Sequence, residues 1–235
     1  MFGEIAPRYD FLNHLLSMNV DRYWRWRTVR KLKPFASDEP ILDVCTGTGD
    51  LALAFHKASP NTRIVGTDFS SEMLAIAERK GQKKCPDAKV EPAANPCIDW
   101  IEADTEQLPL PDDTYQIVSV AFGLRNVSDT DRGLAEMVRT CKPGGKVAVL
   151  EFTTPRRQPL KGFYGWYFRN VLPRIGQVLM RNNSAAYEYL PESVGEFLQY
   201  ERLAERMTAA GLIDVRFYPM TFGIATLYVG EKPIS

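Results

Sequence analysis

From Pro40 onward, short apolar runs alternate with longer segments of helical periodicity, and this rhythm constrains the fold more than any other feature. It is typical of β-strands joined by crossover helices in a mostly parallel sheet. The expected strands are 40–45, 63–67, 98–103, 116–121, 146–152, 214–218 and 226–230, and the expected helices are 50–58, 70–80, 129–141 and 193–210. The last two strands are joined by a short connection, Pro219 to Gly223, which predicts antiparallel pairing. We therefore expect an α/β fold with a mostly parallel seven-stranded sheet and one antiparallel edge strand.

Two further helical segments, 9–32 and 161–181, fall outside this rhythm and are predicted to form a cap. Residues 81–95 are expected to be a polar loop, and Lys142-Pro-Gly-Gly145 a turn that neither a helix nor a strand continues through. The predicted organisation is one domain in four segments. These are an N-terminal helical cap segment at 1–35, a cofactor-binding core at 36–154, a helical cap insertion at 155–192, and a C-terminal helix and strands at 193–235 that complete the sheet.

Composition excludes several function classes. The 235 residues contain 29 lysines and arginines and 29 acidic residues, so the formal net charge is zero. A nucleic-acid binder would usually show a basic excess, so no nucleic-acid partner is expected. The four cysteines lie far apart and form no metal-ligand cluster with the two histidines, so we expect reduced thiols, a cytoplasmic protein and no metal. The N-terminal residues include acids and no apolar run, and no stretch of about 18 apolar residues occurs, so neither a signal peptide nor a membrane span is expected.

The charge is unevenly distributed along the chain. Two segments hold many basic residues and no acidic ones, and both are rich in aromatic residues. The basic residues are Arg22, Arg25, Arg27, Arg30, Lys31 and Lys33 in the first segment and Arg156, Arg157, Lys161, Arg169, Arg174 and Arg181 in the second. The aromatic ones are Tyr23, Trp24 and Trp26, and then Phe163, Tyr164, Trp166, Tyr167 and Phe168. This mixture suits a membrane interface or a bound aromatic ligand. The alternative is aromatic rings packed in a core with solvated arginines around them.

A glycine-rich loop carries the clearest signal for a ligand. Gly47-Thr48-Gly49-Asp50-Leu51-Ala52 follows the first expected strand and opens a helix, and Asp68 ends the second strand. The glycines let the backbone approach a ligand, and Asp68 is placed to accept hydrogen bonds from two ribose hydroxyls. These features predict an adenosine-bearing cofactor. The alternative is a tight turn beside a surface aspartate.

The same loop also fits the G-x-G-x-x-A pattern of dinucleotide-binding proteins, and electrostatics favour a different cofactor. Asp43 and Asp50 flank the loop, and as two unpartnered carboxylates they would repel a pyrophosphate. They would attract the ammonium and sulfonium groups of S-adenosylmethionine. Asp104 and Thr105, after the third expected strand, offer an acidic partner for the adenine amino group.

Blocks of residues along nearly the whole chain resemble one family. They are Phe2-x-x-Ile-Ala-Pro-Arg-Tyr-Asp10, Leu12-Asn13, Trp24-Arg25, the Gly47 to Leu51 loop, Leu108-Pro-x-Pro111, Phe122-Gly-Leu-Arg-Asn-Val127, Lys142-Pro-Gly-Gly145, Leu150-Glu-Phe152 and Tyr189-Leu-Pro-x-Ser193. The chain is similar to the ubiquinone/menaquinone biosynthesis C-methyltransferases, which are Rossmann-like class I methyltransferases. Phe-Gly-Leu-Arg-Asn is the specific block, because generic methyltransferases share only the glycine loop.

The resemblance implies that S-adenosylmethionine is the cofactor and contacts Thr48, Asp68, Asp104 and Thr105. The full set of candidate cofactor residues is Asp43, Gly47, Thr48, Gly49, Asp68, Phe69, Asp104, Thr105 and Ala121. Ala121 stands where the family often has a serine, so a hydroxyl contact there is lost or replaced, and Gln116 replaces a frequent aspartate. The 81–95 loop is longer than is usual in the family, which affects the expected adenine-side rim.

The implied reaction is methylation of a ring carbon of a polyprenylated quinol, either demethylmenaquinol or a benzoquinol of ubiquinone biosynthesis. A phenol-like pKa near 10 makes the reactive oxyanion costly at neutral pH. Arg125 is the candidate to stabilise that oxyanion, and Asn126 the candidate to orient it. Tyr9, Asp10 or His14 are candidates to relay the proton, or they only hold the cap in place.

A polyprenylated substrate lies in a bilayer, so the resemblance also implies transient peripheral contact with a membrane surface by a cytoplasmic protein. It is compatible with a homodimer and implies no nucleic-acid partner. Two other functions stay open from the sequence. One is an NAD-dependent oxidoreductase, which Asp50 disfavours. The other is a non-catalytic S-adenosylmethionine-binding module, which would have no need of Arg125, Asn126 or an aromatic cap.

Overall fold

The structure is a computed structural model that describes residues 20–35, 38–84, 98–156, 158, 162 and 197–234. Its centre is a seven-stranded sheet with the order β3-β2-β1-β4-β5-β7-β6. The strands are β1 (Ile41–Val44), β2 (Ile64–Asp68), β3 (Ile98–Glu102), β4 (Tyr115–Ala121), β5 (Cys141–Phe152), β6 (Ile213–Met220) and β7 (Ala225–Glu231). Five of them, β3 to β5 in sheet order, pair in parallel, whereas β7 runs antiparallel to both β5 and β6. The prediction of a mostly parallel sheet with antiparallel pairing at one edge is confirmed.

The strand order places the functional site. Strand β1 lies between β2 and β4, so the chain leaves β1 toward one edge of the sheet and later returns on its other side. Ligands of open α/β sheets bind at such a switch point, outside the carboxyl ends of the strands. The segments that follow β1, β2 and β4 are therefore expected to surround a ligand.

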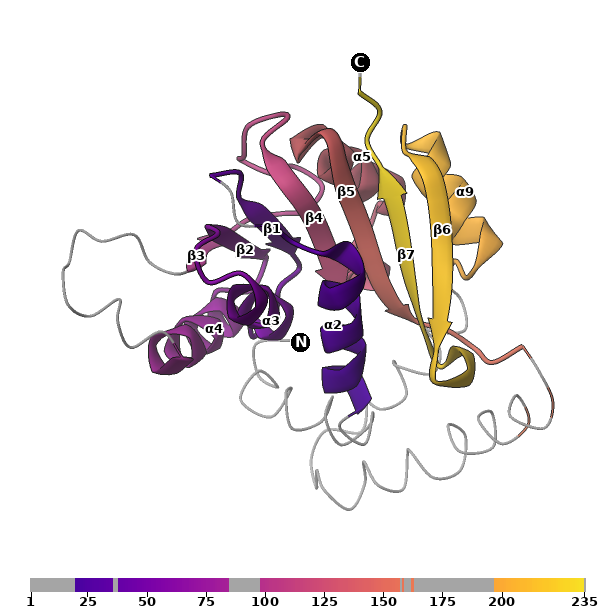
Figure 1. Ribbon diagram of the computed structural model, residues 1–235, viewed down its shortest axis with the longest axis horizontal. Helices are drawn as coiled ribbons and strands as arrows, with labels where there is room; N and C mark the ends of the chain where they lie inside the picture. Colours follow the sequence, from indigo (N-terminus) through magenta and orange to yellow (C-terminus); the bar gives the residue numbers. More distant parts are fainter. Residues whose placement is uncertain are drawn as a thin grey trace.

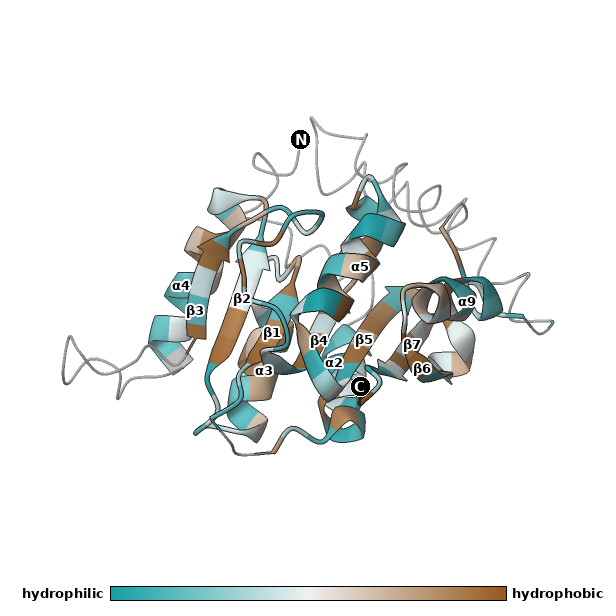
Figure 2. Cartoon of the chain, turned by 90° about the horizontal axis from the view of Figure 1, so that it is seen from above, coloured by the Kyte–Doolittle hydropathy of each residue, from teal (hydrophilic) through white to brown (hydrophobic). Residues whose placement is uncertain are grey.

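Helices cover both faces of the sheet. They are α2 (Val20–Leu32), α3 (Asp50–Ala58), α4 (Ser71–Lys84), α5 (Thr130–Thr140) and α9 (Glu201–Ala209), with short 3-10 turns η2 (Leu124–Asn126) and η4 (Thr221–Gly223). Figure 1 shows α2, α3 and α4 on one face and α5 and α9 on the other. Each face has its own buried apolar cluster, and the hydrophobic colour in Figure 2 is concentrated on the strands between the helices. Among the described residues, no helix combines the length and the apolar character that a bilayer span requires.

Three predicted elements have bounds that differ by four residues or more at one end. Helix α4 continues to Lys84, four residues into the expected 81–95 loop. The helix expected from residue 193 is α9, which begins at Glu201. Residues 197–200 are not helical, and residues 193–196 lie outside the described residues. Strand β5 begins at Cys141 and includes the expected 142–145 turn. A register shift between Tyr115 and Ile117 of the partner strand absorbs the extra residues, so the chain bulges there without leaving the sheet.

The first basic-aromatic segment forms α2, and its two sides differ. Trp24 is buried, its ring packs against Phe122 and Phe152, and its Nε1 donates a hydrogen bond of 2.7 Å to Oγ1 of Thr221. Tyr23 and Trp26 are instead about half exposed. The core-packing alternative therefore holds for Trp24 and not for the other two rings. Most of the second segment lies outside the described residues, and its Arg156 pairs with Glu201 and covers the ring of Tyr200.

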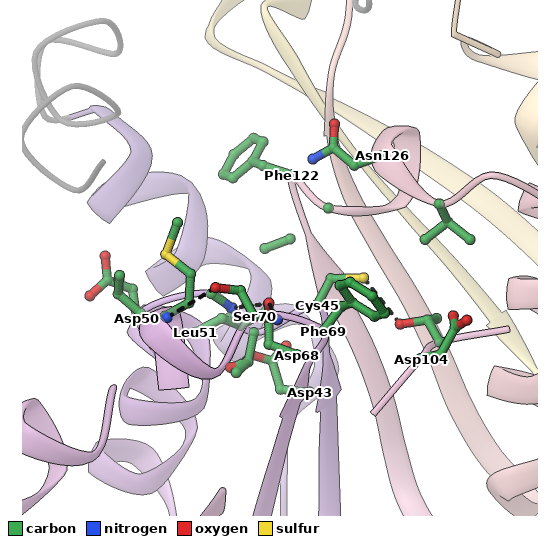
Figure 3. A pocket seen from close by; sticks show the side chains of 18 of the residues that line it. Asp43, Cys45, Asp50, Leu51, Asp68, Phe69, Ser70, Asp104, Phe122 and Asn126 are labelled. Carbon is green, nitrogen blue, oxygen red and sulfur yellow. Dashed lines mark hydrogen bonds between the residues drawn. The ribbon is translucent and has the colours of Figure 1, made fainter. Parts of the chain in front are cut away.

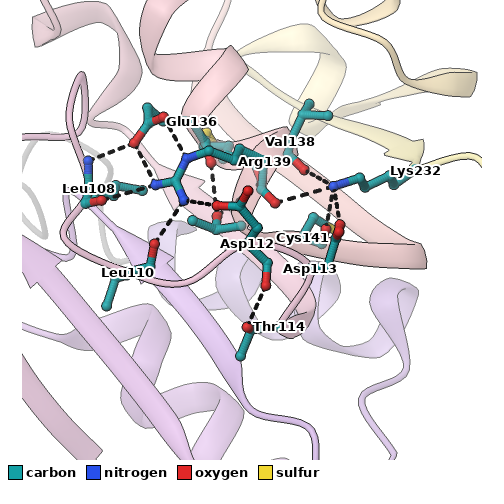
Figure 4. Close-up of polar contacts among 12 residues, drawn as sticks. Leu108, Leu110, Asp112, Asp113, Thr114, Glu136, Val138, Arg139, Cys141 and Lys232 are labelled. Carbon is teal, nitrogen blue, oxygen red and sulfur yellow. Dashed lines mark hydrogen bonds and ion pairs between the residues drawn. The ribbon is translucent and has the colours of Figure 1, made fainter.

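Far from the switch point, two basic side chains hold loops to α5 (Figure 4). Arg139 donates to the backbone oxygens of Leu108 and Leu110, at 3.0 and 2.8 Å, and so supports the segment that follows β3. The Lys232 Nζ donates to Asp113 and to the carbonyl oxygens of Val138, Arg139 and Cys141, at 2.6 to 3.2 Å. Lys232 thus attaches the end of β7 to the junction of α5 and β5.

We expect Lys232→Met to lower the free energy of unfolding by about 1–3 kcal/mol. The variant removes the ammonium group, so all three partly buried carbonyl oxygens lose their hydrogen-bond donor at once. Urea unfolding of the variant and the parent chain measures the difference. Lys57→Met replaces an exposed lysine and serves as the control. Equal stabilities of the two variants would contradict a structural role for Lys232.

Candidate active site

A cavity of about 470 Å³ lies at the carboxyl ends of β1, β2 and β4, where the switch point predicts a ligand (Figure 3). Its volume falls within the range of small-molecule sites. The walls come from the loop after β1, the start of α4, the segment after β3, the turn after β4 and one residue of α2. The lining residues are Arg25, Asp43, Cys45, Thr46, Gly47, Thr48, Asp50, Leu51, Asp68, Phe69, Ser70, Met73, Asp104, Thr105, Glu106, Ala121, Phe122, Gly123, Asn126, Val127 and Ser128.

The loop after β1 turns sharply because three of its residues have left-handed backbone angles. Cys45, Gly47 and Gly49 have φ values of 47°, 58° and 81°. A Cβ on Gly47 would meet nothing within 4 Å, so the backbone there borders open space in which a ligand can approach it. The non-glycine residue Cys45 in this region marks local strain, which is common at functional sites.

Trp100 explains why glycine is needed at two neighbouring positions. A Cβ on Gly49 would lie 2.5 Å from its ring, and a Cβ on Gly66 would lie 2.6 Å from it. The indole on β3 therefore packs under the start of α3 and against β2, with no room for a side chain on either. Gly49 does not line the cavity, and its lack of a side chain allows this packing; its contact with a cofactor stays a prediction.

Asp68 lies at the centre of the cavity wall. Its Oδ2 accepts a hydrogen bond of 2.7 Å from the Gly47 backbone N–H, and its Oδ1 accepts one of 3.0 Å from that of Ser70. Burial raises the pKa of this carboxyl, and these backbone hydrogen bonds oppose the shift. One carboxylate thus joins the loops after β1 and β2 and borders the cavity, as a ribose-binding aspartate must.

Asp43 is the most deeply buried acid of the site, at 1% exposure. Burial raises its pKa to about 6, although the hydroxyls of Thr46 and Ser119 donate to it at 2.6 and 2.8 Å. The folded chain therefore binds this proton more tightly than the unfolded chain, and the associated stability is lost as the pH rises from about 4 through 6. Above pH 6 the carboxylate is charged and adds to the attraction for a cationic ligand.

We expect the affinity for S-adenosylmethionine to rise about tenfold between pH 5 and pH 7.5, with a midpoint near pH 6, because ionised Asp43 attracts the cationic ligand. Calorimetric titrations at several pH values measure this dependence. Asp43→Asn cannot ionise, so its affinity should be nearly constant over the same range. A parent chain with constant affinity would show that Asp43 is not coupled to the ligand.

The two acids that flank the loop are not unpartnered, which corrects the electrostatic argument from the sequence. Asp43 accepts two hydroxyl hydrogen bonds, and Asp50 forms an ion pair of 2.8 Å with the Nζ of Lys80. Lys80 also donates a 2.8 Å hydrogen bond to Thr48 Oγ1. This lysine is on α4, thirty residues along the chain from Asp50, so no local pattern indicates the contact.

The opposite end of the cavity is lined by Asp104, Thr105 and Glu106, after β3. Thr105 Oγ1 lies 3.2 Å from the Sγ of Cys45, and burial raises the pKa of that thiol to about 12. The thiol therefore stays protonated at neutral pH and is a poor nucleophile. Phe69 is 79% exposed at the rim, so its ring is available to cover a flat ligand group.

The turn after β4 forms the remaining wall, and it is held from behind. Phe122 and Asn126 line the cavity, whereas Arg125 does not. The Arg125 side chain is 5% exposed, and its Nη1 donates to the Phe122 carbonyl oxygen at 2.6 Å and pairs with Glu151 Oε2 at 2.9 Å. The Glu151 carboxylate also accepts a hydrogen bond of 3.3 Å from the Arg125 backbone N–H. This buried ion pair fixes η2 and with it the position of Asn126.

The predicted cofactor residues lie close together, around the cavity. All except Gly49 line the cavity, including Ala121, and Asn126 of the predicted catalytic residues joins them. Arg125 is adjacent to the wall without bordering the cavity, so its contact with a substrate oxygen stays a prediction. The candidates Tyr9, Asp10 and His14 lie outside the described residues.

Several lining residues had no role in the prediction from sequence. Arg25 was noted only in a basic segment and in the Trp24-Arg25 block, without a role at the site, and Met73, Glu106 and Ser128 were not singled out. Glu151, behind the wall, was noted only within the Leu150-Glu-Phe152 block. A charged residue inside an apolar strand is a signal that could have marked it, since buried acids need a partner.

Comparison with known proteins shows the family to which the chain belongs. Residues 1–232 match the ubiE/COQ5 methyltransferase family. The chain belongs to the ubiE/COQ5 methyltransferase family. The chain is 44% identical over 236 residues to the ubiquinone/menaquinone biosynthesis C-methyltransferase UbiE of Geobacter sulfurreducens, which covers all of this chain and 88% of that protein. It is 43% identical to the demethylmenaquinone methyltransferase of Thermus thermophilus, over 99% of this chain and 100% of that one.

Solved structures of lower identity show the fold. A SAM-dependent methyltransferase from Aquifex aeolicus is similar with a TM-score of 0.60 and 17% identity, over 88% of each chain. The [4+2]-cyclase SpnF is equally distant in sequence, at 17% identity, with a TM-score of 0.65 over 91% of this chain and 82% of that one. Because a cyclase shares the fold, the fold alone does not specify the reaction.

Membership of the ubiE/COQ5 family confirms the prediction of an S-adenosylmethionine-dependent methyltransferase and excludes the NAD-dependent oxidoreductase. The residues present fit this cofactor. Gly47 leaves the backbone open to a ligand, Asp68 offers a carboxylate to a ribose, and the acids of the cavity suit a ligand with two cationic groups. When bound, the cofactor supplies an electrophilic methyl group at its sulfonium.

Proposed function

We propose that this chain methylates a ring carbon of a polyprenylated quinol, with demethylmenaquinol as the preferred acceptor. The observation that carries the proposal is the 43% identity, over essentially the whole of both chains, to a protein named demethylmenaquinone methyltransferase. A benzoquinol of ubiquinone biosynthesis is the second candidate, because the Geobacter sulfurreducens relative is named for both quinones.

In the proposed reaction the electron pair of the ring carbon forms the new C–CH₃ bond as the S–CH₃ bond breaks, and the proton on that carbon is lost. The ring is reactive enough only when a hydroxyl oxygen carries negative charge. Asn126 lines the cavity and has an amide N–H that can donate to this oxygen. Arg125 and Glu151 act as positioning residues that hold Asn126 and Phe122 in the wall. A proton relay by Tyr9, Asp10 or His14 remains part of the proposal.

The direct test supplies the purified chain with S-adenosylmethionine and chemically reduced demethylmenaquinol, and follows the gain of one methyl group by mass spectrometry. A demethylated benzoquinol is assayed in parallel under the same conditions. We expect faster turnover of the naphthoquinol. Faster turnover of the benzoquinol would reverse the assignment, and cofactor binding without turnover of either would support a non-catalytic binding module.

We also propose that α2 docks the enzyme on an anionic membrane surface, where a polyprenylated substrate resides. The exposed side of α2 carries four basic residues, two aromatic residues and no acidic one. They are Arg22, Tyr23, Trp26, Arg27, Arg30 and Lys31. The Arg30 guanidinium lies 4.8 Å from the centre of the Trp26 ring, and the Lys31 Nζ lies 3.9 Å from that of Tyr218. Basic groups next to half-exposed aromatic rings suit the headgroup region of a membrane.

For this surface, we expect the double variant Trp26→Ala/Arg30→Gln to reduce binding to vesicles with anionic lipids by roughly tenfold, since each basic residue near such a surface contributes about 1 kcal/mol. Co-sedimentation at rising salt measures the effect, and binding should weaken as charges are screened. Arg202→Gln, an exposed change on α9, is the matched control. Equal binding of the parent chain to neutral and anionic vesicles would contradict electrostatic docking.

A further inference from the structure

We infer that Arg25 of α2 binds the carboxylate of the methionine part of S-adenosylmethionine, so that a helix outside the βα core completes the cofactor site. The inference rests on the family's cofactor and not on the identity of the acceptor. It assigns to Arg25 a role that the glycine loop and Asp68 do not fill.

The placement of Arg25 is the first observation. Its side chain lines the cavity and is 11% exposed, in contrast to the exposed basic residues on the other side of α2. Its guanidinium forms an ion pair with Asp21 one turn earlier in the helix, and its Nη1 lies 3.8 Å from Asp50 Oδ2. The Cζ atom is 5.6 Å from the centre of the Phe122 ring. These contacts hold the guanidinium at the cavity wall.

The charges around the cavity give the second observation. Five acids line it, namely Asp43, Asp50, Asp68, Asp104 and Glu106, and Arg25 is the only lysine or arginine among the described residues that do. S-adenosylmethionine has two cationic groups, the ammonium and the sulfonium, and one anionic group. The acids can balance the cations, whereas the ligand carboxylate needs a cationic or N–H donor. Arg25 is the charged side chain that can supply it.

The direction of the cofactor agrees with this assignment. Asp50 and Asp104 lie on opposite sides of Asp68 in Figure 3. With the ribose at Asp68 and the adenine toward Asp104 and Thr105, the amino-acid end extends toward Asp50 and Arg25. Lys80 forms a closer ion pair with Asp50, at 2.8 Å, and so offsets the acid that would otherwise repel the carboxylate.

Arg25 also retains donors for a ligand. Both of its ion pairs use Nη1, and within the part of the chain that the structure describes, neither Nε nor Nη2 makes a hydrogen bond. A guanidinium presents five N–H donors in a planar fork that matches a carboxylate. The pair with Asp21 therefore orients the group without using up its donors.

The test compares two ligands that differ in one group. Calorimetry with S-adenosylmethionine and with decarboxylated S-adenosylmethionine isolates the carboxylate, because both ligands keep the sulfonium and the ammonium. Arg25→Met should weaken binding of S-adenosylmethionine by roughly tenfold to a hundredfold and change binding of the decarboxylated ligand by less than about threefold. Arg25→Lys should lose less, since it keeps a point charge but not the fork.

Two matched variants exclude other causes. Arg27→Met removes an exposed arginine from the same helix and should change neither affinity. Lys80→Met uncovers the charge of Asp50, which repels the ligand carboxylate, while Arg25 stays in place. It should therefore favour the decarboxylated ligand as Arg25→Met does, but by a much smaller factor, because no hydrogen bond to the carboxylate is lost. Melting temperatures without ligand verify that each variant is folded, and if Arg25→Met is not, Arg25→Lys carries the comparison.

Three outcomes would overturn the inference. The first is an unchanged affinity of Arg25→Met for S-adenosylmethionine. The second is an equal loss of affinity for both ligands in Arg25→Met. The third is a Lys80→Met variant whose losses of affinity for the two ligands differ by as much as those of Arg25→Met. Failure of the parent chain to bind S-adenosylmethionine would instead count against the cofactor itself. Because no quinol is present in these titrations, a wrong acceptor in the proposed function leaves the result unaffected.

Discussion

Replacement of Arg125 by alanine is expected to lower turnover by roughly 10² to 10³ and the free energy of unfolding by about 3–5 kcal/mol. Both losses have one cause. The variant leaves Glu151, which is 1% exposed, without the guanidinium it pairs with, and it removes the hydrogen bond that fixes the Phe122 carbonyl. The wall that carries Asn126 then relaxes. Steady-state assays and urea unfolding measure the two effects on the same preparation.

Glu151→Gln distinguishes a positioning role of Arg125 from direct contact with the substrate oxygen. If the pair acts by holding η2, this variant should also lose turnover and stability, although Arg125 remains charged. The loss in Arg125→Ala should then be the same at pH 7 and pH 9.5. If Arg125 instead stabilises the oxyanion directly, Glu151→Gln should stay within about threefold of the parent chain. The defect of Arg125→Ala should then shrink at high pH, where the quinol ionises unaided.

Asp68→Ala is expected to weaken S-adenosylmethionine binding by about a hundredfold. The change removes a carboxylate that borders the cavity, and with it the acceptor for the backbone N–H groups of Gly47 and Ser70. The ribose hydroxyls lose their charge-assisted hydrogen bonds to this carboxylate, which are worth about 1.5–3 kcal/mol. The loop after β1 also loses the side chain that holds it in place. Calorimetry with S-adenosylhomocysteine, which has the same ribose and no sulfonium, should show a similar loss.

Asp68→Asn is the informative companion variant. It keeps an oxygen acceptor for one backbone N–H and loses the charge, so its affinity should fall between those of the parent chain and Asp68→Ala. Asp99→Ala, on β3, removes an acid that pairs with Arg63 away from the cavity and serves as the control. An Asp68→Ala variant that binds within about threefold of the parent chain would remove Asp68 from the ribose site.

The βα core and the central part of its cofactor site were predictable from sequence because their signals are local. Apolar runs mark β1, β2 and β4, and the Gly47 loop and Asp68 stand next to the strands that position them. The turn at 142–145 was predicted as a break in the sheet, since proline and glycine usually end a strand. Its inclusion in β5 depends on a bulge opposite Tyr115, which only the pairing of two strands reveals.

The parts that were not predictable depend on contacts between distant segments. Lys80 reaches Asp50 across thirty residues, and Arg25 reaches the same acid from α2. The assumption that Asp50 is unpartnered failed for this reason, although it favoured the correct cofactor. Arg125 lies in a distinctive block, yet its burial and its pairing with Glu151 follow from the packing of η2 against β5.

The hydrogen bond from Trp24 to Thr221 joins an early helix to the turn between the last two strands, 197 residues later. A ribosome releases these partners in order, so α2 leaves the exit tunnel long before the turn that holds it in place. The nascent chain can pair β1 with β2 and shape the glycine loop early, whereas the hydrogen bond that anchors Trp24 forms only after Thr221 has been made. The last of these contacts on the helix that carries Arg25 therefore forms only near the end of synthesis.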